Sequence, residues 1–144
     1  MGNSKKNKQF IIRNDINELK HLANFLENMG VEWELPGSLI MSVNLALEEA
    51  VSNVILYAFK SGARDEQISP DFSLEKKQLA IGLTDSGRAY NPLQKINPDI
   101  TLPADIRPAG GLGIFLIRQL MNDVKYSRNA NKNILLMVRK RGSS

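Results

Sequence analysis

The sequence contains no cysteine, and its 144 residues include a single histidine, His21. Disulfides, thiolate zinc sites, a cysteine nucleophile and multi-histidine metal centres are therefore excluded, and the lack of thiols fits a reducing cytoplasm. No apolar run approaches the roughly 20 residues that span a bilayer. No apolar segment follows the lysine-bearing N-terminus, as it would in a signal peptide. We therefore expect a cytoplasmic protein with no membrane partner.

Aromatic residues are also scarce, at 6% of the chain, and the net charge is only +4. The basic residues gather at 5–8 and 139–141, without the interleaved aromatics of a nucleic-acid-binding surface. We therefore expect no direct nucleic-acid partner, and a steep salt dependence of DNA affinity would be the sign of one. Length and the 42% apolar content suit one core. We expect a disordered tail over 1–7, one domain over 8–140 and a tail over 141–144.

Residues 36–59 carry the pattern of a long helix. Apolar residues recur at spacings of three and four between positions 40 and 58, and Pro36 suits the helix entry. Glu49 and Asn53 lie one turn apart at the border of the apolar stripe, with apolar residues on both sides. The pattern leaves two interpretations open: the polar pair is satisfied inside the core, or it lines a pocket.

The remaining pattern predicts a layered α/β arrangement. A helix is expected over 16–30, capped by Asn14 or Asp15, with His21 as a surface or packing residue on it. Strands are expected over 9–12, 68–75, 78–84, 124–128 and 134–139, with a hairpin turn at 129–132. Pro70 suggests that the strand over 68–75 lies at a sheet edge.

Two short glycine motifs follow these elements. Asp85-Ser86-Gly87 ends a strand, so it is either an ordinary turn or a carboxylate at a strand end with Gly87 admitting a ligand. The run at 110–113, Gly-Gly-Leu-Gly, precedes an apolar helix whose first N–H groups suit phosphate oxygens. It fits neither the Walker nor the Rossmann fingerprint. The long proline-containing stretch between the motifs has the length of a functional lid.

Taken in order, Glu-x-x-x-Asn, Asp-x-Gly and Gly-x-Gly resemble the motifs of the GHKL ATPases. Within that superfamily the likeness is to the anti-sigma-factor serine kinases, from about residue 10 to 140. Leu-Glu-Glu-Ala-Val-Ser-Asn resembles their N box, and Arg-Pro-Ala-Gly-Gly-Leu-Gly-Ile their phosphate loop. The resemblance implies the Bergerat ATP-binding fold. That fold is an α/β two-layer sandwich, in which a mixed, mostly antiparallel sheet carries helices on one face.

The resemblance also implies the cofactors ATP and Mg²⁺ and a role for each motif residue. Glu49 would be the general base that takes a proton from the attacking hydroxyl, and Asn53 would be a ligand of Mg²⁺. Asp85 would accept a hydrogen bond from the adenine amino group, and Gly87 would let the ring come close. The residues implied for phosphate binding are Arg107, Gly110, Gly111, Leu112 and Gly113.

By this resemblance the protein would be a serine/threonine protein kinase and anti-sigma factor. It would phosphorylate an anti-anti-sigma partner of the STAS type and sequester a sigma factor, and homodimerisation is usual in the subgroup. One alternative is a non-catalytic ATP-binding module that acts by partner exchange. Another is a detached sensor histidine-kinase ATP domain, although no hairpin with a phosphoacceptor histidine precedes the N box. The chain departs from the subgroup at Lys132-Asn133, where many members have Gly-Thr or Arg-Asn.

Overall fold

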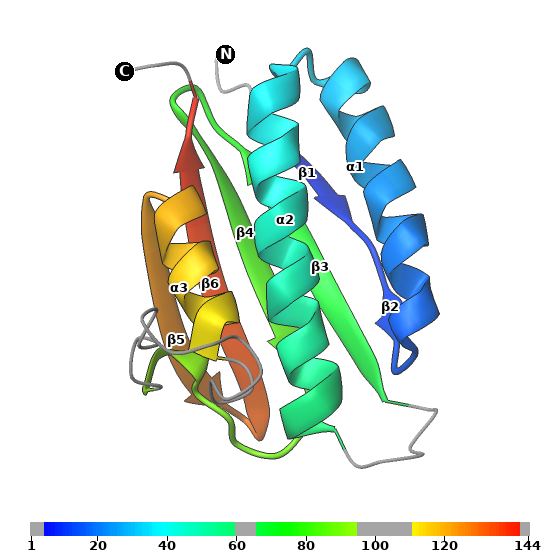
Figure 1. The fold of residues 1–144 in the computed structure, drawn as a ribbon. Helices are drawn as coiled ribbons and strands as arrows, with labels where there is room; N and C mark the ends of the chain where they lie inside the picture. The colour runs from blue at the N-terminus through cyan, green and yellow to red at the C-terminus, as the bar shows by residue number, and fades with distance from the viewer. Residues whose placement is uncertain (1–4, 60–65, 95–110, 142–144) are drawn as a thin grey trace.

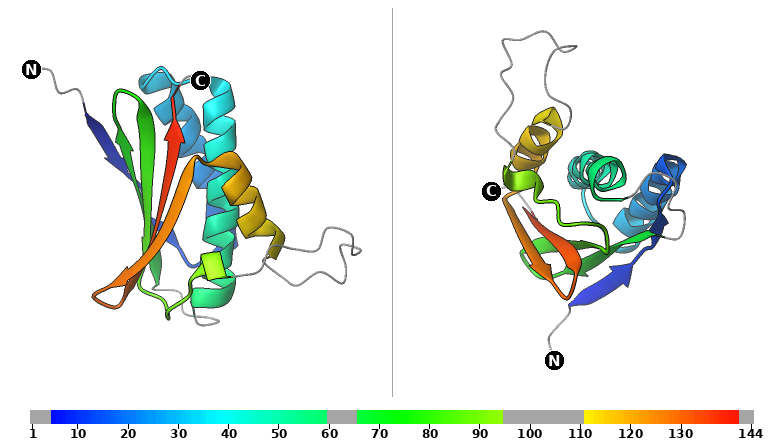
Figure 2. Two further views of the ribbon diagram at one scale, coloured as in Figure 1. Left: turned by 90° about the vertical axis from the view of Figure 1, so that its left-hand side faces the viewer. Right: turned by 90° about the horizontal axis from the view of Figure 1, so that it is seen from below.

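The computed structural model describes residues 5–59, 66–94 and 111–141. A sheet and three helices make up two layers, with the helices on one face of the sheet (Figures 1 and 2). The elements follow in the order β1 (Lys6–Gln9), β2 (Ile12–Arg13), η1 (Ile16–Glu18), α1 (Leu19–Glu32), α2 (Gly37–Asn53), η2 (Val54–Ala58), β3 (Gln67–Leu74), β4 (Gln78–Asp85), η3 (Pro92–Gln94), α3 (Gly111–Leu120), β5 (Asp123–Asn129) and β6 (Lys132–Lys140).

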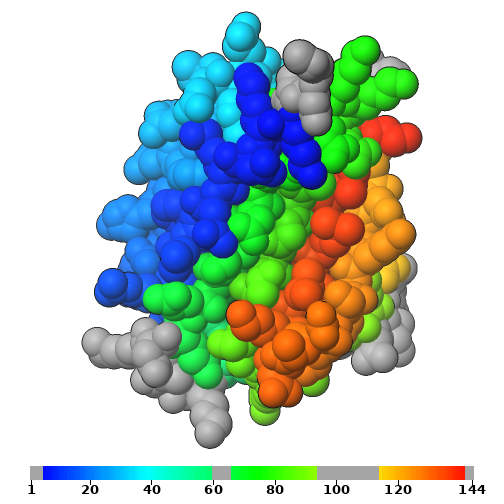
Figure 3. All heavy atoms as spheres, turned by 180° about the vertical axis from the view of Figure 1, so that it is seen from behind, coloured from blue at the N-terminus to red at the C-terminus, as the bar shows by residue number. Residues whose placement is uncertain are grey.

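The sheet has the strand order β1-β3-β4-β6-β5, with β2 pairing β3 next to β1. Every pairing among these strands is antiparallel. The helices leave the opposite face of the sheet uncovered, and the strands themselves form the surface there (Figure 3). The expected two-layer α/β sandwich with helices on one face is therefore confirmed.

Strand β4 shows why the sheet has one buried face. Its residues alternate between full burial at Leu79, Ile81 and Leu83 and partial exposure at the positions between them. Each such buried aliphatic side chain contributes about 1.5–3 kcal/mol relative to exposure. Asp85 is the next residue in the buried series. The alternation therefore carries a carboxylate into the layer between sheet and helices.

Helix α2 lies in the middle of the helical layer, between α1 and α3 (Figure 2). Residues 37–58 are long and apolar enough to cross a membrane by length and composition. However, Val43, Ala46, Leu47 and Val51 are fully buried in the core, as expected for the central helix of this sandwich. After Asn53 the helix widens into the π-helical segment η2, which is a frequent feature of functional sites.

The N-terminal strand differs from the expected run over 9–12. It forms two short pieces, β1 and β2, so residues 6 and 7 of the expected tail lie in a strand. The break falls opposite Pro70, whose carbonyl accepts a hydrogen bond from the Phe10 N–H at 3.1 Å. Proline has no N–H to donate in return. Strand β3 pairs with β1 and β2 on one side and with β4 on the other, so it is not an edge strand. Its proline is accommodated because the neighbouring strand is interrupted opposite Pro70.

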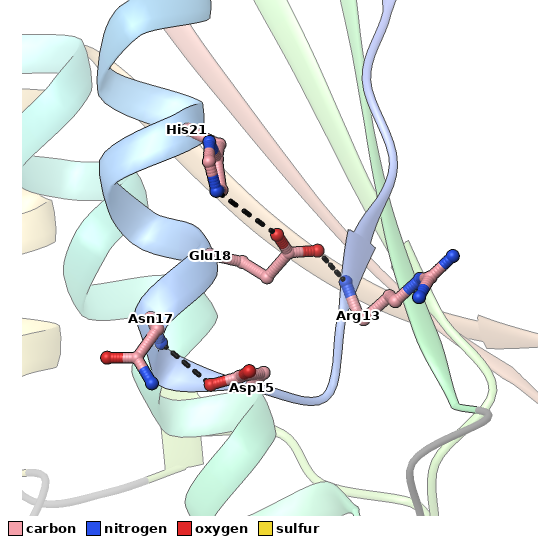
Figure 4. Close-up of polar contacts among 5 residues, drawn as sticks. All are labelled: Arg13, Asp15, Asn17, Glu18 and His21. Atoms are coloured by element: carbon pink, nitrogen blue, oxygen red, sulfur yellow. Dashed lines mark hydrogen bonds and ion pairs between the residues drawn. The ribbon is translucent and has the colours of Figure 1, made fainter.

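The junction between β2 and α1 is held by short-range polar contacts (Figure 4). Asp15 caps η1, as expected, because its carboxylate accepts a hydrogen bond from the Asn17 N–H at 2.9 Å. Glu18 accepts one from the Arg13 N–H at 3.2 Å and lies 3.9 Å from the exposed His21. These contacts give His21 an ordinary surface environment.

Candidate active site

Three polar side chains of the described residues are buried: Asn53, Asp85 and Asn133, each at most 5% exposed. All three line one small cavity between α2, the ends of β4 and β6, and the segment after β4. The rest of its lining is apolar or aromatic and consists of Ala50, Val54, Leu83, Tyr90, Pro92, Tyr126 and Leu135. Convergence of the few buried polar groups on one cavity is the usual signature of a binding site.

The cavity measures about 20 Å³, which is room for about one water molecule. Tyr90 and Pro92 belong to the segment that follows Asp85, and they form part of its wall. A purine ring therefore enters only when these walls move apart.

Asn53 is the last residue of α2 and introduces an unsatisfied group into this cavity. Its Nδ2 atom is buried and has no hydrogen-bond partner within the described residues. Such a group costs about 1–3 kcal/mol. A bound polar ligand next to this carboxamide would relieve that cost. The described residues hold no cluster of three or more side chains suited to a metal. A Mg²⁺ ion next to Asn53 would take its other ligands from water and from the phosphates of a bound molecule.

Only one of the two carboxylate oxygens of Asp85 accepts hydrogen bonds from the described residues. Oδ1 accepts hydrogen bonds from the Gly87 N–H at 2.9 Å and from Nδ2 of Asn133 at 3.0 Å. Oδ2 accepts none from the described residues. Burial raises the pKa of Asp85 above its ordinary value, whereas Asn133, the Gly87 N–H and the charge of Arg128 lower it. Oδ2 is thus the available acceptor on this carboxyl group.

The fold requires a glycine at position 87 even without a ligand, because this residue packs against the end of η2. A Cβ atom added there would lie 2.7 Å from the carbonyl oxygen of Ala58 and 2.9 Å from its carbonyl carbon. The same Ala58 oxygen accepts the Arg88 N–H at 3.0 Å. The glycine therefore allows the turn after Asp85 to lie directly on the helix that carries Asn53.

Replacing Gly87 with alanine is expected to destabilise the protein by about 1–3 kcal/mol, because the backbone of Ala58 must shift. The matched control is Gly82→Ala on the preceding strand β4, where an added Cβ meets nothing within 4 Å. Urea denaturation of the two variants measures the difference. Equal stability of both variants would show that the contact with Ala58 is not tight.

The first part of the expected lid is tethered to the helices. Nε of Arg88 donates to the Tyr57 carbonyl at 2.7 Å, and Arg118 of α3 donates to the Leu93 carbonyl at 3.1 Å. Tyr90 stacks on Tyr57 with ring centroids 5.4 Å apart. In the free protein these contacts hold residues 88–94 against the helices, where the segment closes one side of the cavity. The rest of the expected lid, with Arg107 and Gly110, lies outside the described residues.

The remaining predicted residues that the structure describes lie on α2 and at the start of α3. Glu49 is partly buried, one turn before Asn53 on α2, and is not part of the cavity wall. Gly111 is the first residue of α3, so Leu112 and Gly113 fall in its first turn, as the glycine motif predicted. Helix α3 packs on α2. The structure thus brings Asn53, Asp85 and Gly87 together and puts Glu49 on the adjacent turn.

Four residues of the site carried no functional prediction: Tyr90, Tyr126, Arg128 and Asn133. All four contribute to a hydrogen-bond cluster around the Asn133 side chain. Asn133 faces Asp85 across the β4–β6 pair and Arg128 across the β5–β6 pair. The strand register therefore creates the cluster. The departure from the usual Gly-Thr at 132–133 was the one signal that pointed to it.

Comparison with known proteins supports an ATP-binding domain. Residues 12–139 match the family described as histidine kinase-like ATPase domain. The chain is 34% identical over 90 residues to the serine-protein kinase RsbW of Listeria monocytogenes, covering 60% of this chain and 57% of that protein. It is 26% identical over 114 residues to the serine/threonine-protein kinase BtrW of Bordetella bronchiseptica, covering 79% and 80%. The chain thus spans somewhat more than half the length of RsbW.

Solved structures agree on the fold. The crystal structure of the RsbU and RsbW domains of a Mycobacterium tuberculosis protein superposes with a TM-score of 0.68 at 13% identity. The superposition covers 96% of this chain and 34% of the Mycobacterium tuberculosis chain. The histidine kinase domain of a blue-light-activated histidine kinase from Erythrobacter litoralis gives a TM-score of 0.55 at 16% identity, covering 89% and 61%. With its two-layer fold and a family match over most of its length, the chain belongs to the histidine kinase-like ATPase domain family.

Proposed function

We propose that this protein binds Mg·ATP at the cavity of Asn53 and Asp85 and acts as a serine/threonine protein kinase. The observation that carries the proposal is the convergence of these two buried side chains on one cavity. The match to a histidine kinase-like ATPase domain and the likeness to proteins named serine-protein kinases support the choice of nucleotide and of reaction.

Each residue would act through the atoms that its surroundings leave available. Oδ2 of Asp85 accepts a hydrogen bond from the amino group of the base, because Oδ1 is already engaged. The buried carboxamide of Asn53 would hold the cation through its oxygen. The first turn of α3 presents N–H groups to phosphate oxygens. Bound Mg·ATP supplies the phosphoryl group and the cation that offsets the phosphate charge.

Glu49 is the candidate general base. It is partly buried and lies one turn before Asn53 on α2, away from the π-helical segment that follows Asn53. A carboxylate there can take the proton from a serine hydroxyl as the hydroxyl attacks the terminal phosphate. Catalysis otherwise consists of positioning and charge stabilisation.

The proposed protein substrate is a serine or threonine of a STAS-type anti-anti-sigma protein, and the second partner is a sigma factor. Both follow from the resemblance of the N box and the phosphate loop to the anti-sigma-factor kinases. By this proposal, phosphorylation of the first partner leaves the kinase free to sequester the second.

The test is transfer of labelled phosphate from ATP to a STAS-domain protein that carries an acceptor serine. We expect stoichiometric labelling of that protein and none of its Ser→Ala form, with mass spectrometry locating the phosphate. ATP binding without transfer would contradict the kinase assignment. It would favour a non-catalytic module that exchanges partners, an alternative consistent with the position of Glu49 outside the cavity wall.

A further inference from the structure

The side chain of Asn133 is the centre of the hydrogen-bond cluster at the end of β4. Its Nδ2 group donates to Oδ1 of Asp85 at 3.0 Å and to the Arg88 carbonyl at 2.8 Å. Both N–H bonds of the amide are therefore used. One of them links the last strand of the sheet to the carboxyl group at the candidate nucleotide site.

The oxygen of the same amide is surrounded by donors. Oδ1 of Asn133 accepts hydrogen bonds from Nη1 of Arg128 at 2.9 Å, from the Tyr126 hydroxyl at 2.5 Å and from the Tyr90 N–H at 3.3 Å. Rotating the amide by 180° would turn its NH₂ group toward these three donors. The contacts therefore determine the orientation of the amide.

This fixed orientation has a direct consequence for Asp85. An amide that can only donate toward Oδ1 requires an unprotonated oxygen there, and the Gly87 N–H imposes the same requirement. Any proton on Asp85 must then reside on Oδ2. The state of Oδ2 decides which base the site accepts, because an ionised Oδ2 receives a hydrogen bond and a protonated one donates it.

We propose that Asn133 is a positioning residue that keeps Oδ2 of Asp85 as a hydrogen-bond acceptor, and so makes the site select 6-amino over 6-oxo purines. The proposal rests on the nucleotide site proposed above. A 6-amino group donates to the ionised Oδ2. The 6-oxo group of an inosine or guanine base would place a second acceptor against it, which leaves both groups unsatisfied.

Burial raises the pKa of Asp85, and the positive charge of Arg128 acts against this and favours the ionised state. From β5, Arg128 is the charged group that acts on it, and Tyr126 of the same strand is a neutral donor to Asn133. The segment after β4 contributes Tyr90, whose pKa is raised by burial, so that its hydroxyl is neutral at physiological pH. On α2 the cavity-lining polar side chain is the uncharged Asn53.

The experiment compares the affinities for ATP and inosine triphosphate by calorimetry, because these two nucleotides differ at the 6-position. Asn133→Leu keeps the approximate volume and removes every hydrogen bond, and Asn133→Thr restores a single donor. For Asn133→Leu we expect the ratio of ATP to inosine triphosphate affinity to fall roughly tenfold or more, as for the loss of a bond to a charged group. Asn133→Thr is expected to recover part of the ratio. Asn129→Ala, an exposed asparagine on neighbouring β5, is the control and should keep it.

The pH profile separates positioning from a purely structural role. In the wild-type protein, ATP affinity and the ATP preference should fall as pH is lowered through the pKa of Asp85. In Asn133→Leu this fall should begin at a higher pH, because the carboxylate has lost a donor that lowers its pKa. The wild-type profile does not depend on how well any variant folds.

The outcomes are distinguishable. If the wild-type protein binds ATP selectively and Asn133→Leu keeps both the ratio and the pH profile, the role of Asn133 is wrong while the nucleotide site stands. A wild-type preference that does not change with pH contradicts the dependence on the state of Oδ2. If the wild-type protein binds neither nucleotide, the proposed function fails and this inference fails with it.

Discussion

Asp85→Asn is expected to lower ATP affinity by at least about a hundredfold while leaving the fold intact. Asparagine can present its carbonyl oxygen to the two donors that now bind Oδ1, from Gly87 and Asn133. Its NH₂ group then replaces Oδ2 and meets the amino group of adenine as a second donor. For the same reason the variant should prefer inosine triphosphate to ATP, which calorimetry with both nucleotides measures.

The same substitution is expected to stabilise the free protein at neutral pH. Burial raises the pKa of Asp85 above its ordinary value, so the ionised carboxylate disfavours the folded state. A group with a raised pKa stabilises the fold only at low pH, and this contribution disappears as pH rises through its folded-state pKa. Urea denaturation at pH 7 should therefore show Asp85→Asn to be more stable than wild type. The difference should shrink as pH is lowered.

Asp71→Asn is the matched control, because Asp71 is exposed on the neighbouring strand β3. This variant should change neither nucleotide preference nor stability appreciably. If Asp85→Asn binds ATP as wild type does, Asp85 does not contact the base and the assignment of the site is wrong.

Glu49→Gln is expected to slow phosphoryl transfer by roughly a hundredfold to ten-thousandfold. Glutamine has nearly the shape of glutamate but cannot take up the proton of the attacking hydroxyl. ATP affinity should stay close to the wild-type value, because Glu49 does not line the cavity. Single-turnover transfer of labelled phosphate to a STAS-domain partner separates these two effects.

The control for this variant is Glu48→Gln, which changes the adjacent carboxylate on a different side of the helix. It should leave the transfer rate unchanged. Wild-type transfer rates in Glu49→Gln would remove Glu49 from the mechanism, and a loss that is equal in both variants would indicate a general electrostatic effect.

Local patterns predicted most of the fold. The expected strand at 78–84 corresponds to β4, and the expected helix at 36–59 corresponds to α2 followed by η2, because burial alternates or repeats clearly in both. Strand β1 was missed, since Lys6–Gln9 carries no apolar residue and exists only through its pairing with β3. The π-helical segment was missed as well, because its uniformly apolar residues give no sign of a wider turn.

The site was predictable only in part, for a physical reason. Asn53 and Asp85 belong to short motifs, and their burial follows from the periodicity of their own elements. The contacts of Asn133 depend instead on the register between strands. Its bond to Asp85, for example, joins two residues that are 48 positions apart in the sequence. No local pattern encodes such a register. Gly87 is expected from the sequence to let a ligand come close, and the structure shows that it also lets the backbone of Ala58 come close.

The most direct test of an ATP site at Asn53 and Asp85 is a thermal-denaturation series with ATP, with and without Mg²⁺, on the wild-type protein and Asn53→Ala. We expect ATP at a hundredfold excess over its dissociation constant to raise the wild-type melting temperature by roughly 8 °C. Mg²⁺ should increase this shift in the wild-type protein and have little effect in Asn53→Ala. A melting temperature that millimolar ATP leaves unchanged, or an identical Mg²⁺ effect in both proteins, would contradict the proposed ATP site.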